Sequence, residues 1–346
     1  MRRDGIVLPL LVAALGCGDA PPTDSVGDSS LPRTTGAASS HREPGGDEKV
    51  GATGKTLLAL RLEEGQTFVL QSTTQQTVTK TVDNRELTVH QTIVLHKRQT
   101  VESVESDGVA IVDVEFVRVK LDEVTAQGKR VYDSENPPEG PPPPTPFASL
   151  AGRHYTKHVA PDGSIVKLEG VDRLLDEMFE TNPADAGPTR KLYRELVRSY
   201  FDGAGIEDME QIATPVFPPR EVGTGDVWMN RIVIGSVMPA VLVQTYEVVR
   251  RSGGKTIISV KTDVEPNDEA DPVLSGPDAK LVLSGRQTGM LTVDEKTGLT
   301  IAKTVHQDLS GKSSVESPDD RKARDTPITV RGTTKLEIVL DPSTDE

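Results

Sequence analysis

The stretch that decides the fold reads ELTVHQTIVLHKRQTV (residues 86–101), SDG (106–108) and VAIVDVEFVRVKLDEV (109–124). The two long runs are rich in Val, Ile and Thr, and the Asp-Gly pair between them is a turn signal, so they predict two antiparallel strands. In the second run Val112 and Val114 share one face, and the apolar positions then change parity to Val117 and Val119. A change of parity within a strand predicts a β-bulge. We therefore expect a strongly curved sheet.

Similar runs recur along the chain, separated by turn signals such as Glu63-Glu64-Gly65 and Asp83-Asn84. They predict further strands at Thr56–Leu62, Gln66–Val82, Asp226–Ile234, Val241–Arg251, Thr256–Val264, Lys280–Val293, Leu299–Leu309 and Thr326–Leu340. The expected fold class is therefore mainly β, a β-rich α+β fold with long curved antiparallel sheets.

A helical insert interrupts these strands. Two sets of apolar residues at helical spacing predict an amphipathic pair of helices: Val171, Leu174, Leu175, Met178 and Phe179, followed by Leu192, Tyr193, Leu196, Val197 and Tyr200. A third helix is expected near residues 206–213. We expect the pair to pack on a concave face of the sheet. There Leu175, Met178, Leu192 and Leu196 either face an apolar ligand or complete the core.

Short patterns also recur in the two β-rich halves. Glu64-Gly65-Gln66-Thr67-Phe68 resembles Thr224-Gly225-Asp226-Val227-Trp228, and residues 152–166 resemble residues 285–301. This repetition predicts a duplicated β unit, with chance recurrence of turn chemistry as the alternative. The expected segments are a signal peptide (1–16), a lipidated cysteine with a disordered tether (17–54), a first β unit (55–169), the helical insert (170–215) and a second β unit (216–346).

The N-terminus has the layout of an export signal. Arg2 and Arg3 precede an apolar run over residues 6–15 that is too short to span a bilayer. Ala14-Leu15-Gly16-Cys17 resembles the lipobox of bacterial lipoproteins, with Ala14 and Leu15 where a Leu and a small residue are usual. The resemblance implies cleavage before Cys17 and membrane attachment through lipid on it. The body would then face the periplasm or the exterior. The alternative is an ordinary secretory signal followed by an incidental cysteine.

Composition excludes several classes of function. Lys and Arg number 39 against 53 Asp and Glu, which gives a net charge of −14. An acidic surface is repelled by phosphate backbones, so nucleic acid is not an expected partner. Cys17 is the only cysteine, so no disulfide can form within the chain. No later apolar run is long enough to predict a membrane-spanning helix.

Motifs for chemistry are weak. His154 and His158 would share a metal ion on a helix, but on a strand the same spacing separates them by about 13 Å. Residues 51–56 lack the first glycine of a phosphate-binding loop, and Ser252 and Lys255 bracket a Gly-Gly turn. Residues 265–272 read as a solvated acidic loop rather than a calcium loop. We therefore expect no catalytic residue, no metal and no cofactor.

The order of these features resembles an uncharacterised family of bacterial envelope proteins, DUF6263. The residues that carry the resemblance are Leu62 to Phe68, Tyr132-Asp133-Ser134, Asp162-Gly163 with Gly170, Phe217-Pro218-Pro219, and Gly225 to Trp228. The resemblance implies fold and location and carries no activity. We expect a non-enzymatic, lipid-anchored binding or scaffolding module whose partner is an unknown envelope protein or an apolar ligand. A carrier of an apolar or acyl ligand is the alternative, and an unrecognised enzyme is the third.

Overall fold

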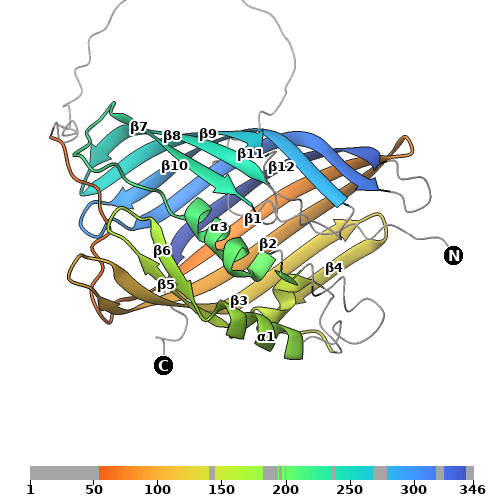
Figure 1. Ribbon diagram of the computed structural model, residues 1–346, viewed down its shortest axis with the longest axis horizontal. Helices are drawn as coiled ribbons and strands as arrows, with labels where there is room; N and C mark the ends of the chain where they lie inside the picture. Colours follow the sequence, from red (N-terminus) through yellow and green to blue (C-terminus); the bar gives the residue numbers. More distant parts are fainter. Residues whose placement is uncertain are drawn as a thin grey trace, which may run out of the picture.

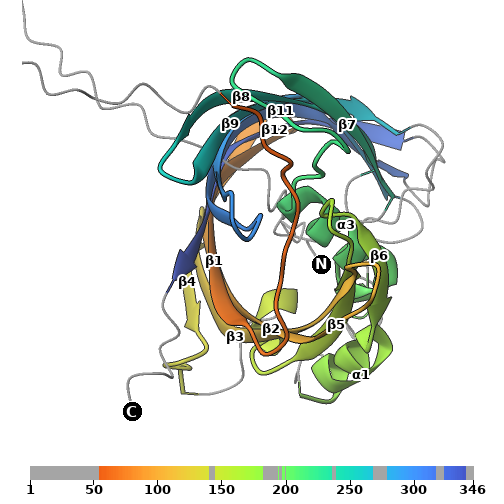
Figure 2. The same cartoon turned by 90° about the vertical axis from the view of Figure 1, so that its left-hand side faces the viewer.

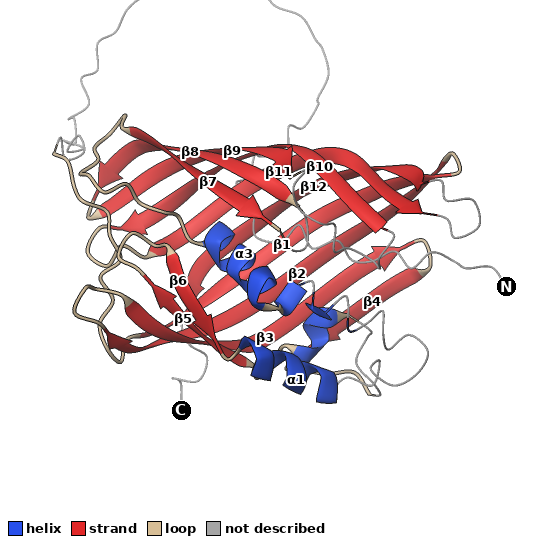
Figure 3. Ribbon diagram, viewed as in Figure 1, coloured by secondary structure: helices blue, strands red, loops and turns tan. Residues whose placement is uncertain are grey.

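One curved antiparallel sheet makes up most of the molecule (Figures 1 and 3). The computed structural model describes residues 54–139, 145–181, 194, 197–198, 200–235, 239–267, 279–316 and 323–339. The strands are β1 (Thr67–Val82), β2 (Arg85–Val104), β3 (Ala110–Thr125), β4 (Gly128–Asp133), β5 (His154–Val159), β6 (Ile165–Glu169), β7 (Val227–Ile234), β8 (Ala240–Ser252), β9 (Lys255–Pro266), β10 (Ala279–Asp294), β11 (Thr300–Glu316) and β12 (Ala323–Val339). The predicted mainly β class is confirmed.

Most neighbouring strands in the sheet also follow one another in sequence. The main exception is at the centre of the sheet, where the first strand, β1, pairs with the last, β12. The order across the sheet is β6-β5-β3-β2-β1-β12-β11-β10-β9-β8-β7, with β4 paired to β3. The seam between β1 and β12 runs from Val69 paired with Val339 to Lys80 paired with Ile328. The strands before and after the helices therefore form the two sides of one sheet. The division into five segments stays a prediction.

The two faces of the sheet differ in burial. On β10, for example, Leu283 and Leu291 are buried, whereas Arg286 and Met290 are exposed. We call the buried side the inner face and the exposed side the outer face. The inner face follows the period of two expected for strands that are half covered.

The bulge predicted in β3 is confirmed. The pairing of β2 with β3 shifts between His96, which pairs with Arg118, and Lys97, which pairs with Phe116. Val117 is thus the extra residue, and the buried positions change parity from Phe116 to Val119 as expected. Such a bulge increases local twist and bends the strand.

The prediction of a strand at Thr56–Leu62 is wrong. We call residues 54–66 the strap; only Thr56 forms a bridge, with Val222. Two strap residues bond to turns, Leu60 N to Pro161 O (2.7 Å) and Arg61 N to Thr297 O (2.8 Å), and the end of the strap bonds to Val101 of β2 through Gly65 and Gln66. Its apolar side chains pack in the interior: Leu58 belongs to a core cluster with Phe217 and Trp228, and Leu60 and Leu62 pack against the main core. Figure 2 shows the strap crossing one end of the curled sheet.

Helices pack near the two edges of the sheet, which are formed by β6 and β7. α1 (Val171–Thr181) contacts β5 and the short helix η1 (Pro146–Ser149), whereas α3 (Gly203–Ala213) contacts both edge strands, β6 and β7 (Figure 2). The carboxylate of Asp202 caps α3 by accepting from Gly205 N at 2.8 Å. Within the described part of the chain, no helix is long and apolar enough to cross a membrane.

Candidate functional site

A buried ionic cluster joins α3 to the inner face of the sheet. The Glu210 carboxylate accepts from Lys157 Nζ at 2.6 Å, from the Tyr155 hydroxyl at 2.7 Å and also from Lys97 Nζ. The side chains of Lys157 and Glu210 are only 7% and 2% exposed, and that of Lys97 is 14% exposed. Two cations and one anion therefore meet where little water reaches them.

Burial and the two lysines determine how these groups ionise. Burial alone would raise the pKa of Glu210, but the positive charges of Lys157 and Lys97 hold that pKa well below its usual range. Burial lowers the pKa of Lys157; the Glu210 carboxylate partly offsets this shift, and the nearby Lys97 adds to it. Burial and the Glu210 charge raise the pKa of Tyr155. Glu210 is thus an anion at neutral pH, and Tyr155 remains a neutral donor.

Three separate elements hold the cluster in place. Lys97 projects from β2, Tyr155 and Lys157 project from β5, and Glu210 lies on the apolar side of α3 with the fully buried Ile206 one turn earlier. The C-terminus of α3 is fixed as well, because Lys303 Nζ on β11 donates to Ile212 O at 2.9 Å. A cation at this end also stabilises the helix dipole.

An inner pocket lies beside the cluster. Its polar lining includes Lys97, Lys157, Glu210 and Gln99. Its apolar wall comes from the strap, β1, β12 and the segment after α3, through Leu60, Leu62, Phe68, Leu70, Leu336 and Phe217. The pocket has a volume of about 60 Å³, the space of roughly two water molecules at about 30 Å³ each. Its lining is amphipathic, with one cationic end.

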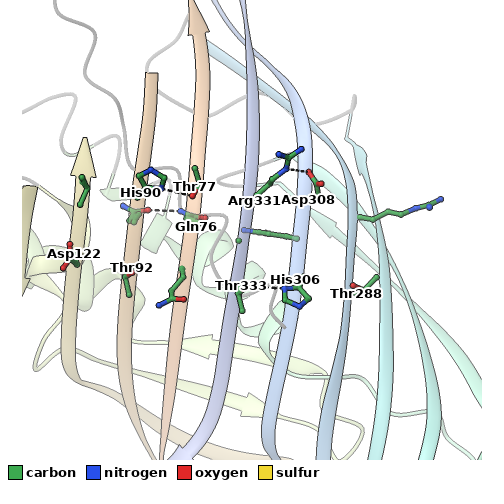
Figure 4. Close-up of a pocket in the computed structure, with 16 residues that line it drawn as sticks. Gln76, Thr77, His90, Thr92, Asp122, Thr288, His306, Asp308, Arg331 and Thr333 are labelled. Carbon is green, nitrogen blue, oxygen red and sulfur yellow. Dashed lines mark hydrogen bonds and ion pairs between the residues drawn. The ribbon is translucent and has the colours of Figure 1, made fainter. Parts of the chain in front are cut away.

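A second hollow lies on the outer face across the seam (Figure 4). We call it the outer trough; its volume is about 880 Å³. On one side of the seam the Thr77 hydroxyl bonds to His90 Nδ1 at 2.9 Å, and on the other Thr333 bonds to His306 Nδ1 at 3.2 Å. The two Thr–His pairs are related by the local two-fold symmetry of an antiparallel strand pair.

The charges of the outer trough are matched across strands. Arg331 Nε donates to Asp308 at 3.2 Å, and Lys129 pairs with Asp122 at 2.6 Å. The trough therefore offers hydrogen bonds rather than a strong field. The described residues contain no group of three His, Cys, Asp or Glu that could hold a metal ion. His154 and His158 both lie on a strand, β5, where they bond separately to Asp113 (3.2 Å) and Glu169 (3.4 Å).

The site residues expected from the sequence lie elsewhere. Cys17, Leu192 and Leu196 are outside the described residues. Leu175 and Met178 are buried in the main core, and neither is among the residues that line the inner pocket. The helix that reaches the pocket is α3 rather than α1.

The cluster itself was missed, although the sequence carried a signal for it. Lys97 shares the parity of the buried Ile93 on β2, so a lysine stands on an apolar face. Glu210 follows Ile206 at a spacing of four, which places a carboxylate on the apolar side of a helix. Charged residues at such positions are rare unless they are paired.

Comparison with known proteins gives a family but no activity. The model of a family of unknown function, DUF6263, matches residues 107–300. No curated protein matches the chain. A structure of lipovitellin, described by its lipid–protein interactions, is 9% identical with a TM-score of 0.43; the match covers 81% of this chain and 26% of that one. DynF from the dynemicin pathway of Micromonospora chersina is 10% identical over 87% of this chain and 95% of that one, with a TM-score of 0.18. Pseudomonas aeruginosa OpdQ is 8% identical over 80% of this chain and 100% of that one, with a TM-score of 0.20. TM-scores this low do not establish a common fold.

Proposed function

The chain belongs to the DUF6263 family, whose function is unknown, and we propose that this member is a non-enzymatic binding protein for an anionic amphiphile. The anionic group of the ligand lies beside Lys97 and Lys157. Its apolar part lies along the inner pocket. The single observation that carries this proposal is that two buried lysines share one carboxylate at the end of an apolar pocket.

The charge balance of the cluster favours an anion. Lys97 and Lys157 contribute two positive charges and Glu210 one negative charge, so the described members sum to +1. A buried charge without a partner costs several kcal/mol. A carboxylate or phosphate on a ligand would balance the cluster and accept hydrogen bonds from the lysines.

The apolar wall supports a ligand with a hydrocarbon part. Most of the side chains that line the pocket are apolar, and each buried CH₂ contributes about 0.8 kcal/mol to binding. The present volume of about 60 Å³ is too small for an acyl chain, so the ligand requires part of the wall to move. The strap supplies Leu60 and Leu62 to that wall and is held by few backbone hydrogen bonds, which makes it the element to move.

Membrane attachment through lipid on Cys17 belongs to the same proposal. An anchored protein with a tether over residues 17–54 holds the pocket near a bilayer in the cell envelope, where anionic amphiphiles are abundant. Replacement of Cys17→Ser is expected to abolish fatty-acid labelling and to release the protein from membranes. Unchanged labelling would contradict this part of the proposal.

The test of the ligand site is displacement of a fluorescent fatty acid from the purified full-length chain. Palmitate is expected to displace the probe. Lys97→Met leaves Glu210 paired with Lys157 and is expected to weaken palmitate binding about tenfold. Binding of the uncharged hexadecanol should not change, because it places no anion in the cluster. Lys261→Met, at an exposed position of β9, is the matched control.

Two results would contradict the proposal. One is a failure of palmitate to displace the probe at all. The other is equal palmitate affinity in the wild type and the Lys97→Met variant.

Scaffolding is a second candidate function, which the outer trough favours. Its volume of about 880 Å³ and its hydrogen-bonding side chains suit an uncharged polar partner. A double variant, His90→Ala with His306→Ala, is expected to abolish crosslinks to an envelope protein if the trough is used. Crosslinks that persist in this variant would argue against a role for the trough.

A further inference from the structure

A row of polar residues crosses the inner face from strand to strand. We call it the amide row: Glu123, Gln91, Gln76, Gly332, Gln307, Gln287, Thr262, Gln244 and Asn230. Each member pairs directly in register with the next, so the row passes through β3, β2, β1, β12, β11, β10, β9, β8 and β7. One polar or glycine residue therefore occupies the same level on nine neighbouring strands.

The amide row is buried. Gln76, Gln91 and Gln244 are only 3% to 4% exposed, although apolar residues flank them on the same face. Neighbouring members bond to each other in places: Gln76 Nε2 donates to Gln91 Oε1 at 2.8 Å, and Asn230 Nδ2 donates to Gln244 Oε1 at 3.4 Å. Buried amides are retained in proteins where their hydrogen bonds are used.

One member of the amide row, Gln287, has a side-chain amide without hydrogen-bond partners among the described residues. Gln287 is 1% exposed, and neither its amide oxygen nor its amide nitrogen has a hydrogen-bond partner among the described residues. It lies between Gln307 and Thr262 in the row and has the parity of the buried Leu283 and Leu291, so it points to the inner side. An amide both donates and accepts, so its natural partner is an uncharged hydroxyl or amide.

The amide row and the ionic cluster both lie on the inner face of the sheet, at different positions along the strands. On β2, Gln91 and Lys97 are six residues apart, which is about 20 Å along a strand. The residues between them on the inner face are Ile93 and Leu95, which pack in the main core. Gln287 stands at the level of Gln91 but on β10, four strands across the sheet from β2, so the chain of the ligand has to cover this distance and also cross the curled interior.

We propose that the amide row is a second subsite, which takes an uncharged hydroxyl or amide at the far end of the ligand. This inference rests on the proposed function and narrows its ligand class. The ligand is an amphiphile with an anionic group at one end, a neutral hydrogen-bonding group at the other and an apolar chain between them. The side-chain amide of Gln287 forms hydrogen bonds with the neutral group of the ligand.

The experiment compares palmitate with ω-hydroxypalmitate on the purified full-length chain, by displacement of the same fluorescent fatty acid. The wild type is expected to bind ω-hydroxypalmitate about fivefold to tenfold more tightly, because the hydroxyl satisfies a buried amide. Gln287→Met, which is nearly the same size, is expected to remove that preference and to leave palmitate affinity unchanged. Gln75→Met, on the exposed outer face of β1, should keep the preference.

Folding of the variant is checked in the same samples. Gln287→Met removes a buried amide without a partner, so the thermal midpoint of the ligand-free variant is expected to rise. If Gln287→Met fails to fold, Thr262→Val at the adjacent row position takes its place and is expected to weaken the same preference.

Each outcome has a distinct meaning. Equal affinity for the two acids in the wild type would overturn this inference and leave the proposed function standing. A preference that survives Gln287→Met and Thr262→Val would overturn it as well. If neither acid binds, both the proposed function and this inference fail.

Discussion

The strands β1 to β3 and the strands β7 to β9 begin with the same turn but differ on their inner faces. Gly65 N donates to Val101 O at 2.8 Å, and Gly225 N donates to Val248 O at 2.8 Å. In each case the pairing of the following strand shifts directly after that valine. The two turns are thus alike in their backbone hydrogen bonds, and the duplication stays a prediction.

The inner faces beyond these turns are not alike. Phe68, which follows the first turn, lines the inner pocket beside Lys97. Trp228, which follows the second turn, stacks on Tyr246 with ring centroids 5.2 Å apart and donates through Nε1 to Val216 O at 3.0 Å. The corresponding place on the second side is thus filled by aromatic rings.

The comparison distinguishes the features that form the sheet from the side chains that form the candidate site. Both sides use the same backbone hydrogen bonds and glycine turns, because these set strand starts and curvature. On the first side, Lys97 and Lys157 bind the Glu210 carboxylate of α3, whereas Lys303 on the second side binds backbone carbonyls at the end of that helix. We therefore expect substitutions in the cluster to affect ligand binding, and substitutions in the repeated turns to affect stability alone.

The largest effect is expected for Glu210→Leu. This change leaves Lys97 and Lys157 buried without their carboxylate, so the free energy of unfolding should fall by about 3–5 kcal/mol. Urea unfolding measures it. Glu207→Leu, at an exposed position of the same helix, is the control and should change little. A similar loss of unfolding free energy in both variants would show that the ionic cluster makes no special contribution to the first side of the sheet.

A smaller effect is expected for Gly65→Ala and Gly225→Ala. Both glycines have positive φ, 79° and 86°, and no atom lies within 4 Å of the position that an alanine Cβ would take. The loss then comes from backbone conformation alone, about 1–2 kcal/mol in each variant. Thermal unfolding of the two variants should give equal shifts, and Asn at either position should be less harmful. Unequal shifts would weaken the equivalence of the two turns.

The smallest effect is expected for Glu123→Gln, at the end of the amide row. Burial raises the pKa of Glu123, so its ionised form destabilises the folded protein relative to the unfolded chain. The Gln variant should therefore have a slightly higher thermal midpoint at pH 7. The advantage should disappear on acidification, once the carboxyl is protonated in both states. A lower midpoint at neutral pH would mean that the ion pair with Arg130, at 3.6 Å, outweighs burial.

Much of the fold was predictable because its strands begin and end at local signals. The parity change in β3 located the bulge, and the Asp-Gly and Asp-Asn pairs located turns. The strap was misread because its apolar residues resemble a strand, whereas they pack into the core with a single β-bridge, at Thr56. The short strand β4 was not predicted.

The candidate site was less accessible from the sequence. Lys97 and Glu210 each stood on an apolar face, which is a local signal, but they lie 113 residues apart. No local pattern says that α3 folds back onto β2 and β5. The amide row needs the register of nine strands, which the sequence does not contain in any one segment.

The pairing of β1 with β12 has a consequence for the order of folding. Thr74 and Thr334 share a hydrogen bond at 2.8 Å across 260 residues of chain, so the centre of the sheet forms only when its last strand has arrived. Contacts of such long sequence separation slow folding, because a large loop closes before they are made. During synthesis the sheet therefore stays incomplete until β12 emerges, and β1 exposes an unpaired edge until then.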